Sequence, residues 1–166
     1  AKEIEKLKLK DRYYMKDGKI AYEMMKKFGL GIKNSELEKI EVGLDNRFKD
    51  NDTDGDGLPD KMEEALKTDS YDSDSDDDGY SDGDEVRGDF NPMGSGKIII
   101  DKNTGEKVKG KILLQVESRG EAWYINPKDG KRYYMKDGDN AYQIMRFLSL
   151  GIKNNDLTKI KEGKMQ

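Results

Sequence analysis

Two acidic segments of twelve residues in the middle of the chain restrict what it can fold into. Residues 52–63 and residues 74–85 both carry carboxylates at positions 1, 3, 5, 9 and 12 and a glycine at position 6. The second segment begins 22 residues after the first and has the same residue types at all six positions. Carboxylates this close together repel one another, so this part of the chain requires a counter-charge before it can become compact.

The spacing predicts two loops that wrap around calcium, since both segments match D-x-[DN]-x-[DN]-G-x5-E. Calcium takes about six to eight oxygen ligands, the glycine permits a sharp turn, and position 7 offers its backbone carbonyl. Magnesium fits less well because it demands a tighter octahedron and keeps several waters. The predicted ligands are Asp52, Asp54, Asp56, Leu58, Asp60 and Glu63 in the first loop and Asp74, Asp76, Asp78, Tyr80, Asp82 and Glu85 in the second. We therefore expect two or more Ca²⁺ ions as a folding cofactor, and a largely unfolded segment in chelator.

Residues 51–86 resemble the bacterial thrombospondin type 3-like repeats of secreted and cell-surface proteins. The shared marks are Gly-Leu-Pro-Asp at residues 57–60, a short helix over Met62–Leu66 and the Thr68-Asp69 stop. The resemblance implies an extracellular location and sites shared between neighbouring loops, which adds Asp69 and Asp72 as further ligands. Ser70 stands where these repeats usually have proline, so the link between the loops is expected to be less rigid.

Two other classes of calcium protein fit the loops less well. Sensor EF-hands flank each loop with long amphipathic helices, whereas here Asp50 almost abuts the first loop and a helix of only about six residues can follow it. Dockerins carry two such loops, but their longer helices and their usual aspartate at the closing position are missing. A rigid calcium-bound structural segment is the better interpretation.

Composition excludes most other functions. The chain of 166 residues has neither cysteine nor histidine, which removes disulfides, thiolate nucleophiles and the Ser/His/Asp triad. Paired carboxylates can perform acid/base chemistry, but those that cluster here are predicted metal ligands, so we expect no enzyme. Residues 50–92 hold 17 acids against 3 bases and the basic residues are spread over both flanks, so we expect no nucleic-acid partner. No stretch approaches the roughly 18 apolar residues that span a bilayer, and any signal or anchor is expected outside this sequence.

The two flanks are copies of one another. Residues 11–40 and residues 131–160 are identical at 18 of 30 positions, an internal duplication with an offset of 120 residues. We therefore expect an α+β protein in three parts. These are an N-terminal strand–helix half-module (residues 1–49), a tandem calcium-binding segment (50–92) and a C-terminal β-meander plus helix (93–166).

Periodicity predicts the elements of each copy. An aromatic strand (Arg12–Met15 and Arg132–Met135) is followed by an amphipathic helix that ends near Gly29 or Gly31 in one copy and Gly151 in the other. In the first copy, Asn34 and Ser35 begin a second helix with Glu38 as a capping-box residue, running through Leu37, Ile40 and Leu44. Further strands are expected at Lys97–Asp101, Lys107–Glu117 and Ala122–Asn126, and Lys6–Lys10 is available beside the first copy.

The first copy looks like half a module, with an unpaired strand edge that would be unstable alone. Either the two copies pack together into one pseudo-symmetric domain, which we favour, or another chain or an upstream segment supplies the missing strands.

Three functions remain open: the two described next, and a calcium-regulated accessory domain of a toxin or an enzyme. In the first, calcium rigidifies the segment between the flanking modules, within an adhesion or envelope protein. In the second, they bind a cell-wall glycan or a surface protein through a concentration of aromatic residues beside lysines. Those residues are Tyr13, Tyr14, Trp123, Tyr124, Tyr133 and Tyr134. The competing interpretation is that alternate members of this set are core.

Overall fold

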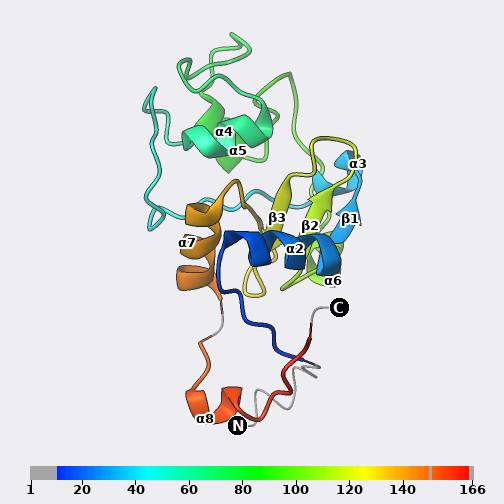
Figure 1. The fold of residues 1–166 in the computed structure, drawn as a ribbon. Coiled ribbons are helices and arrows are strands. Elements are labelled where there is room, and N and C mark those ends of the chain that lie inside the picture. The colour runs from blue at the N-terminus through cyan, green and yellow to red at the C-terminus, as the bar shows by residue number, and fades with distance from the viewer. Residues whose placement is uncertain (1–10, 150, 165–166) are drawn as a thin grey trace.

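The computed structural model describes residues 11–149 and 151–164. The expected strand at Lys6–Lys10 lies outside the described residues. The elements shown in Figure 1 are α2 (Gly18–Phe28), β1 (Leu30–Ile32), α3 (Asn34–Leu37), α4 (Asp60–Leu66), α5 (Asp82–Arg87), α6 (Lys102–Lys107), β2 (Ile112–Gln115), β3 (Ala122–Ile125), β4 (Arg132–Tyr134), α7 (Gly138–Leu148) and α8 (Asn154–Leu157).

The fold is mixed α+β and is organised around a four-stranded sheet in the order β1-β2-β3-β4. Strands β2, β3 and β4 form an antiparallel meander, and β1 joins its edge in parallel with β2, placing Leu30 opposite Leu113. The sheet therefore contains residues from both sides of the acidic block.

One predicted strand of the meander is wrong. Residues 98–101 form no strand, and Lys97 makes only an isolated bridge to Phe90. The expected turn after them is helix α6, because the Asp101 side chain accepts hydrogen bonds from the Asn103 N–H (3.0 Å) and the Thr104 hydroxyl (2.8 Å). The fourth strand is β1, which periodicity did not single out.

The duplicated helices are confirmed with some corrections at their ends. The side chains of Asp17 and Asp137 cap α2 and α7, and α7 stops at Leu148, before Gly151. The second helix of the first copy is only α3, and its capping box is wrong. Lys33 occupies the cap position, while the Asn34 side chain accepts a hydrogen bond from Gln115 (2.8 Å) across the sheet. The Asn34 side chain therefore bonds to Gln115 on β2 instead of capping the helix.

The expected strand at Arg12–Met15 is also wrong, since only Arg12 forms a bridge, to Glu162 near the other end of the chain. The two copies do pair with each other, because Val42 of the first also bridges to Arg132 of the second. The sheet does not share this symmetry. Residues 151–152, which correspond to the end of β1, are not in a strand.

One hydrophobic core joins the acidic block to the sheet. Its buried residues are Leu37, Ile40, Leu58, Met62, Val86, Leu113, Trp123 and Ile125. Leu58, Met62 and Val86 belong to the acidic segments, whose helices α4 and α5 lie together at the end of the molecule opposite α8 (Figure 1). The acidic block is therefore packed on the module rather than being a detached linker.

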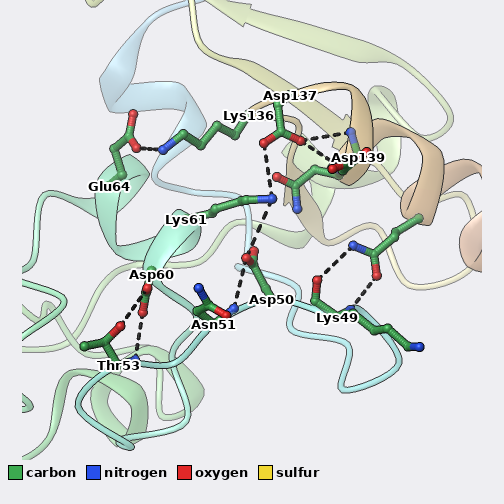
Figure 2. A network of polar contacts seen from close by, with 12 residues as sticks. Lys49, Asp50, Asn51, Thr53, Asp60, Lys61, Glu64, Lys136, Asp137 and Asp139 are labelled. Carbon is green, nitrogen blue, oxygen red and sulfur yellow. Dashed lines mark hydrogen bonds and ion pairs between the residues drawn. The ribbon is translucent and has the colours of Figure 1, made fainter.

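Polar contacts reinforce this packing (Figure 2). The ammonium of Lys61 on α4 lies 3.2 Å from Asp137, the cap of α7, and 3.7 Å from Asp50. Lys136 forms an ion pair with Glu64, the neighbour of a predicted calcium ligand. Both bridges connect α4 to the start of the second copy's helix. No helix in the described ranges is long and apolar enough to cross a membrane.

Candidate metal centre

Two aspartate triads lie at the positions that the loop pattern predicts. Carboxylate oxygens of Asp52, Asp54 and Asp56 all lie within 4.8 Å of one another. Asp74, Asp76 and Asp78 form the same arrangement in the second loop. Each triad gathers positions 1, 3 and 5 of its loop, so it offers several hard oxygen ligands to one cation.

The backbone of each loop is folded around its first aspartate. The N–H of Gly57 donates to Asp52 Oδ2 at 3.0 Å, and the N–H of Gly79 donates to Asp74 Oδ2 at 2.9 Å. Both glycines have positive φ (+87° and +96°), which a residue with a Cβ rarely adopts. Glycine at position 6 therefore lets the loop reverse direction while its carboxylates converge.

The carboxylates at position 9 play a different part from the triads. Asp60 accepts hydrogen bonds from the N–H and the hydroxyl of Thr53, both at 2.8 Å. Asp82, which is fully buried, accepts the same two bonds from Ser75 at 3.2 and 2.6 Å. The position-2 hydroxyl residues were not among the predicted site residues, although comparing the two loops shows that both carry one there. They tie the end of each loop to its beginning.

The two closing glutamates are buried and incompletely hydrogen-bonded. Glu63 is 0% exposed and Glu85 is 6% exposed. The Oε2 atom of each is buried and has no hydrogen-bond partner in the described part of the chain. A buried carboxylate oxygen without a partner is costly, and a cation at the end of the loop would satisfy it.

The electrostatics of the two glutamates agree with this geometry. Burial, reinforced by the charge of Asp54, raises the pKa of Glu63 to about 7. Burial, followed by the charges of Asp78 and Asp76, raises the pKa of Glu85 to about 7. Burial also raises the pKa of Asp54, whose Oδ2 is a further buried atom without a partner among the described residues. Each loop thus concentrates negative charge that a bound cation would neutralise.

Direct contacts couple the two loops. The Gly83 N–H in the second loop donates to Asp56 Oδ2 in the first at 2.5 Å. The guanidinium of Arg87, which follows the second loop, donates to the Gly57 carbonyl at 2.6 Å and to the Asp56 carbonyl at 3.4 Å. Neither Gly83 nor Arg87 was among the predicted site residues, because their role depends on how the loops pack and not on spacing within one loop.

The other predicted ligands are placed less centrally. The side chain of Leu58 is in the core and that of Tyr80 is exposed, as suits residues expected to offer only carbonyls. Asp69 and Asp72 are exposed and belong to neither triad. Their side chains accept hydrogen bonds from the nearby backbone N–H groups of Tyr71 and Asp74.

The six aromatic residues do not form one surface. Trp123 and Tyr133 are buried, and Trp123 packs against Tyr134 with ring centroids 5.1 Å apart. Tyr14 is 78% exposed, and Tyr13, Tyr124 and Tyr134 are partly buried. Trp123 and Tyr133 are therefore core residues, as the competing interpretation expected for part of this set.

The loops define a class of site: a tandem of acidic, glycine-turned loops, each closed by a glutamate, with two Asp triads able to bind Ca²⁺. Residues 52–73 and 74–88 match the family model of the bacterial TSP3 repeat. The predicted thrombospondin type 3-like resemblance is thus confirmed for residues 52–88. No curated protein and no solved structure matches the chain.

Proposed function

We propose that this chain is a calcium-dependent structural module of a secreted or cell-surface protein, and that binding of two or more Ca²⁺ ions sets the fold of the whole module. The single observation that carries the proposal is the shared core. Leu58 and Met62 of the first loop and its helix, and Val86 of the second, pack with Trp123 and Ile125 of the sheet. Cation binding in the loops is therefore linked to burial of the module's apolar surface.

The geometry gives a path from the metal to the sheet. Glu63 would bind calcium at the end of the first loop, and it lies on α4 next to the core residue Met62. On the same helix, Lys61 and Glu64 form the bridges to Asp137 and Lys136. A cation that holds Glu63 therefore positions α4 against both the sheet and the second copy's helix. A role in adhesion or in an envelope is consistent with such rigidity, and calcium is plentiful outside cells.

The test compares ligand variants with a matched control in the second loop. Glu63→Gln and Glu85→Gln should each weaken calcium binding by at least about tenfold in calorimetric titration, because each removes a bidentate ligand. Asp77→Asn removes one charge from the second loop without touching a predicted ligand, and should change affinity little. Asp77 has φ of +58°, which asparagine also tolerates.

Structure is followed on the same samples by circular dichroism and by the fluorescence of Trp123, the one tryptophan. Calcium added to chelator-treated protein should increase the ordered structure and change the Trp123 emission. Binding without any change in either signal would show that the loops take up calcium independently of the core, and would contradict the proposed function.

A further inference from the structure

The second copy is joined to the first by a short pairing beside the sheet. The Arg132 N–H donates to the Glu41 carbonyl at 2.9 Å, and the Gly43 N–H donates to the Arg132 carbonyl at 2.8 Å. Gly43 lies against the Tyr133 ring, where a Cβ would come within 2.2 Å of a ring carbon. We call these four residues the sheet junction.

The two ends of the described chain repeat this pairing at the same offset of 120 residues. The Arg12 N–H donates to the Lys161 carbonyl at 2.7 Å, and the Gly163 N–H donates to the Arg12 carbonyl at 2.8 Å. A Cβ on Gly163 would lie 2.3 Å from a carbon of the Tyr13 ring. We call Arg12, Tyr13, Lys161 and Gly163 the terminal junction. In Figure 1 the two segments are coils that meet away from the sheet.

Charge distinguishes the two junctions. In the sheet junction, Lys131 forms an ion pair with Glu41. The equivalent residues beside the terminal junction carry the opposite signs, Asp11 and Lys161. Exchanging partners between the junctions would place Asp11 beside Glu41 and Lys131 beside Lys161. Repulsion between like charges therefore disfavours this exchange, so the segment on each side of a junction has one favoured partner.

The terminal junction is far less buried than its counterpart. Leu148 packs against Tyr133 and is 4% exposed, whereas the equivalent Phe28 stacks on Tyr13 (centroids 4.8 Å apart) and is 45% exposed. Among the described residues, β1 is anchored to β2 by strand pairing, but its counterpart in residues 151–152 forms no strand. The contacts that join the terminal halves are those of Arg12 and Tyr13 with residues 161–163, and such contacts are the same whether both halves come from one chain or from two.

We propose that the terminal junction is a docking site for a second copy of this chain, in which residues 161–163 of one copy bind Arg12 and Tyr13 of the next. The two halves are different surfaces, so the contact is head-to-tail and can propagate along a row of copies. Two features specify a second copy of this chain as the partner. One is the opposite charge of Asp11 and Lys161, and the other is the residue pairing, which is the same as in the sheet junction. This proposal does not depend on calcium binding.

Pairing within one chain competes with pairing between chains. The partner half in the same chain has an effective concentration on the order of millimolar. At a protein concentration of roughly 0.3 mM, pairing between two chains is therefore frequent enough for a disulfide to trap it. The protein has no cysteine, which makes disulfide trapping unambiguous. Arg12 and Glu162 are bridge partners, and neighbouring strands lie about 4.8 Å apart, within the Cα separation that a disulfide allows.

The experiment mixes an Arg12→Cys chain with a Glu162→Cys chain, in calcium, and follows oxidation by intact mass and non-reducing gels. We expect the mixed dimer to exceed either homodimer by at least about tenfold and to increase with protein concentration. A double variant, Arg12→Cys with Glu162→Cys, should also close within one chain, which verifies the geometry.

Matched controls separate docking from collision. Adding Gly163→Leu to the Glu162→Cys chain should suppress the mixed dimer, because the new leucine side chain would meet the Tyr13 ring. Gly151→Leu places a side chain in open space and should leave the mixed dimer unchanged. Lys161→Glu should also suppress it, and Asp11→Lys on the partner chain should restore it. A mixed dimer no more abundant than the homodimers, or one unaffected by Gly163→Leu, would overturn the proposal. Exclusively intrachain closure of the double variant would do so as well.

Discussion

Calcium binding by this protein should release protons near neutral pH. In loops that keep their folded arrangement without calcium, the pKa values of Glu63 and Glu85 are raised from 4.5 to about 7, so each side chain is about half protonated at pH 7. A loop that unfolds in chelator loses this burial and contributes no proton release. A carboxylate must lose its proton to bind Ca²⁺. The two glutamates together should therefore release about one proton per protein at pH 7 and fewer than about 0.1 at pH 8.5.

The release is measured by calorimetric calcium titration in pairs of buffers that have different ionisation enthalpies. The difference in apparent binding enthalpy between the buffers gives the number of protons released. Glu63→Gln should remove about half of the release at pH 7, as should Glu85→Gln. The control variant Asp77→Asn should leave it unchanged. Proton release that does not vary between pH 7 and 8.5, or that survives both glutamine substitutions, would refute the assignment of these buried carboxylates as ligands.

The same shifts fix the sign of the pH dependence in chelator. Because the folded-state pKa of each glutamate exceeds its ordinary value of 4.5, the folded protein without calcium binds more protons than the unfolded chain between about pH 4.5 and 7. The free energy of unfolding contributed by Glu63 and Glu85 therefore falls as the pH rises through this window. Saturating calcium should remove this dependence at neutral pH, since both side chains are then held as carboxylates.

Three further predictions test the packing. Gly83→Ala would place a Cβ 2.4 Å from the Asp56 carbonyl, so a change in the second loop should weaken calcium binding at the first by about tenfold, and unchanged titrations would contradict the coupling. Gly43→Ala, whose Cβ meets the Tyr133 ring, should lower the free energy of unfolding in calcium by about 1–3 kcal/mol in chemical denaturation, while Gly138→Ala, with open space around it, should change it by less than about 0.5 kcal/mol. Equal losses would argue against the close approach. In limited proteolysis, trypsin should cut the acidic block in chelator and spare it in calcium, and a digestion pattern independent of calcium would mean that the metal does not order the block. The tryptic sites in the block are Lys61, Lys67 and Arg87.

Local spacing was enough to predict much of the site. The predicted ligands of one loop lie within twelve residues, and the turn that gathers Asp52, Asp54 and Asp56 is made by the loop's own glycines and backbone N–H groups. The 3.6-residue period likewise predicted α2 and α7. These features depend on contacts between near neighbours in the chain, so they can be read from residue order alone.

Long-range contacts decided the rest. The sheet took its fourth strand from β1 and not from residues 97–101, because pairing with β2 packs Ile32 against the core that contains Leu113, whereas the Ile99 side chain is 84% exposed. The burial of Glu63, the contact of Arg87 with the first loop, and the shared core of the loops and the sheet all join residues far apart in the chain.

The sequence by itself thus determined the two acidic loops, the duplication and the helices that begin each copy. The tertiary structure alone decided that the loops are built into the module's core and that the halves of each junction come from different copies. The physical reason is that charge, turn and helix preferences act over a few residues, whereas burial is settled only when distant segments compete for the same apolar surface.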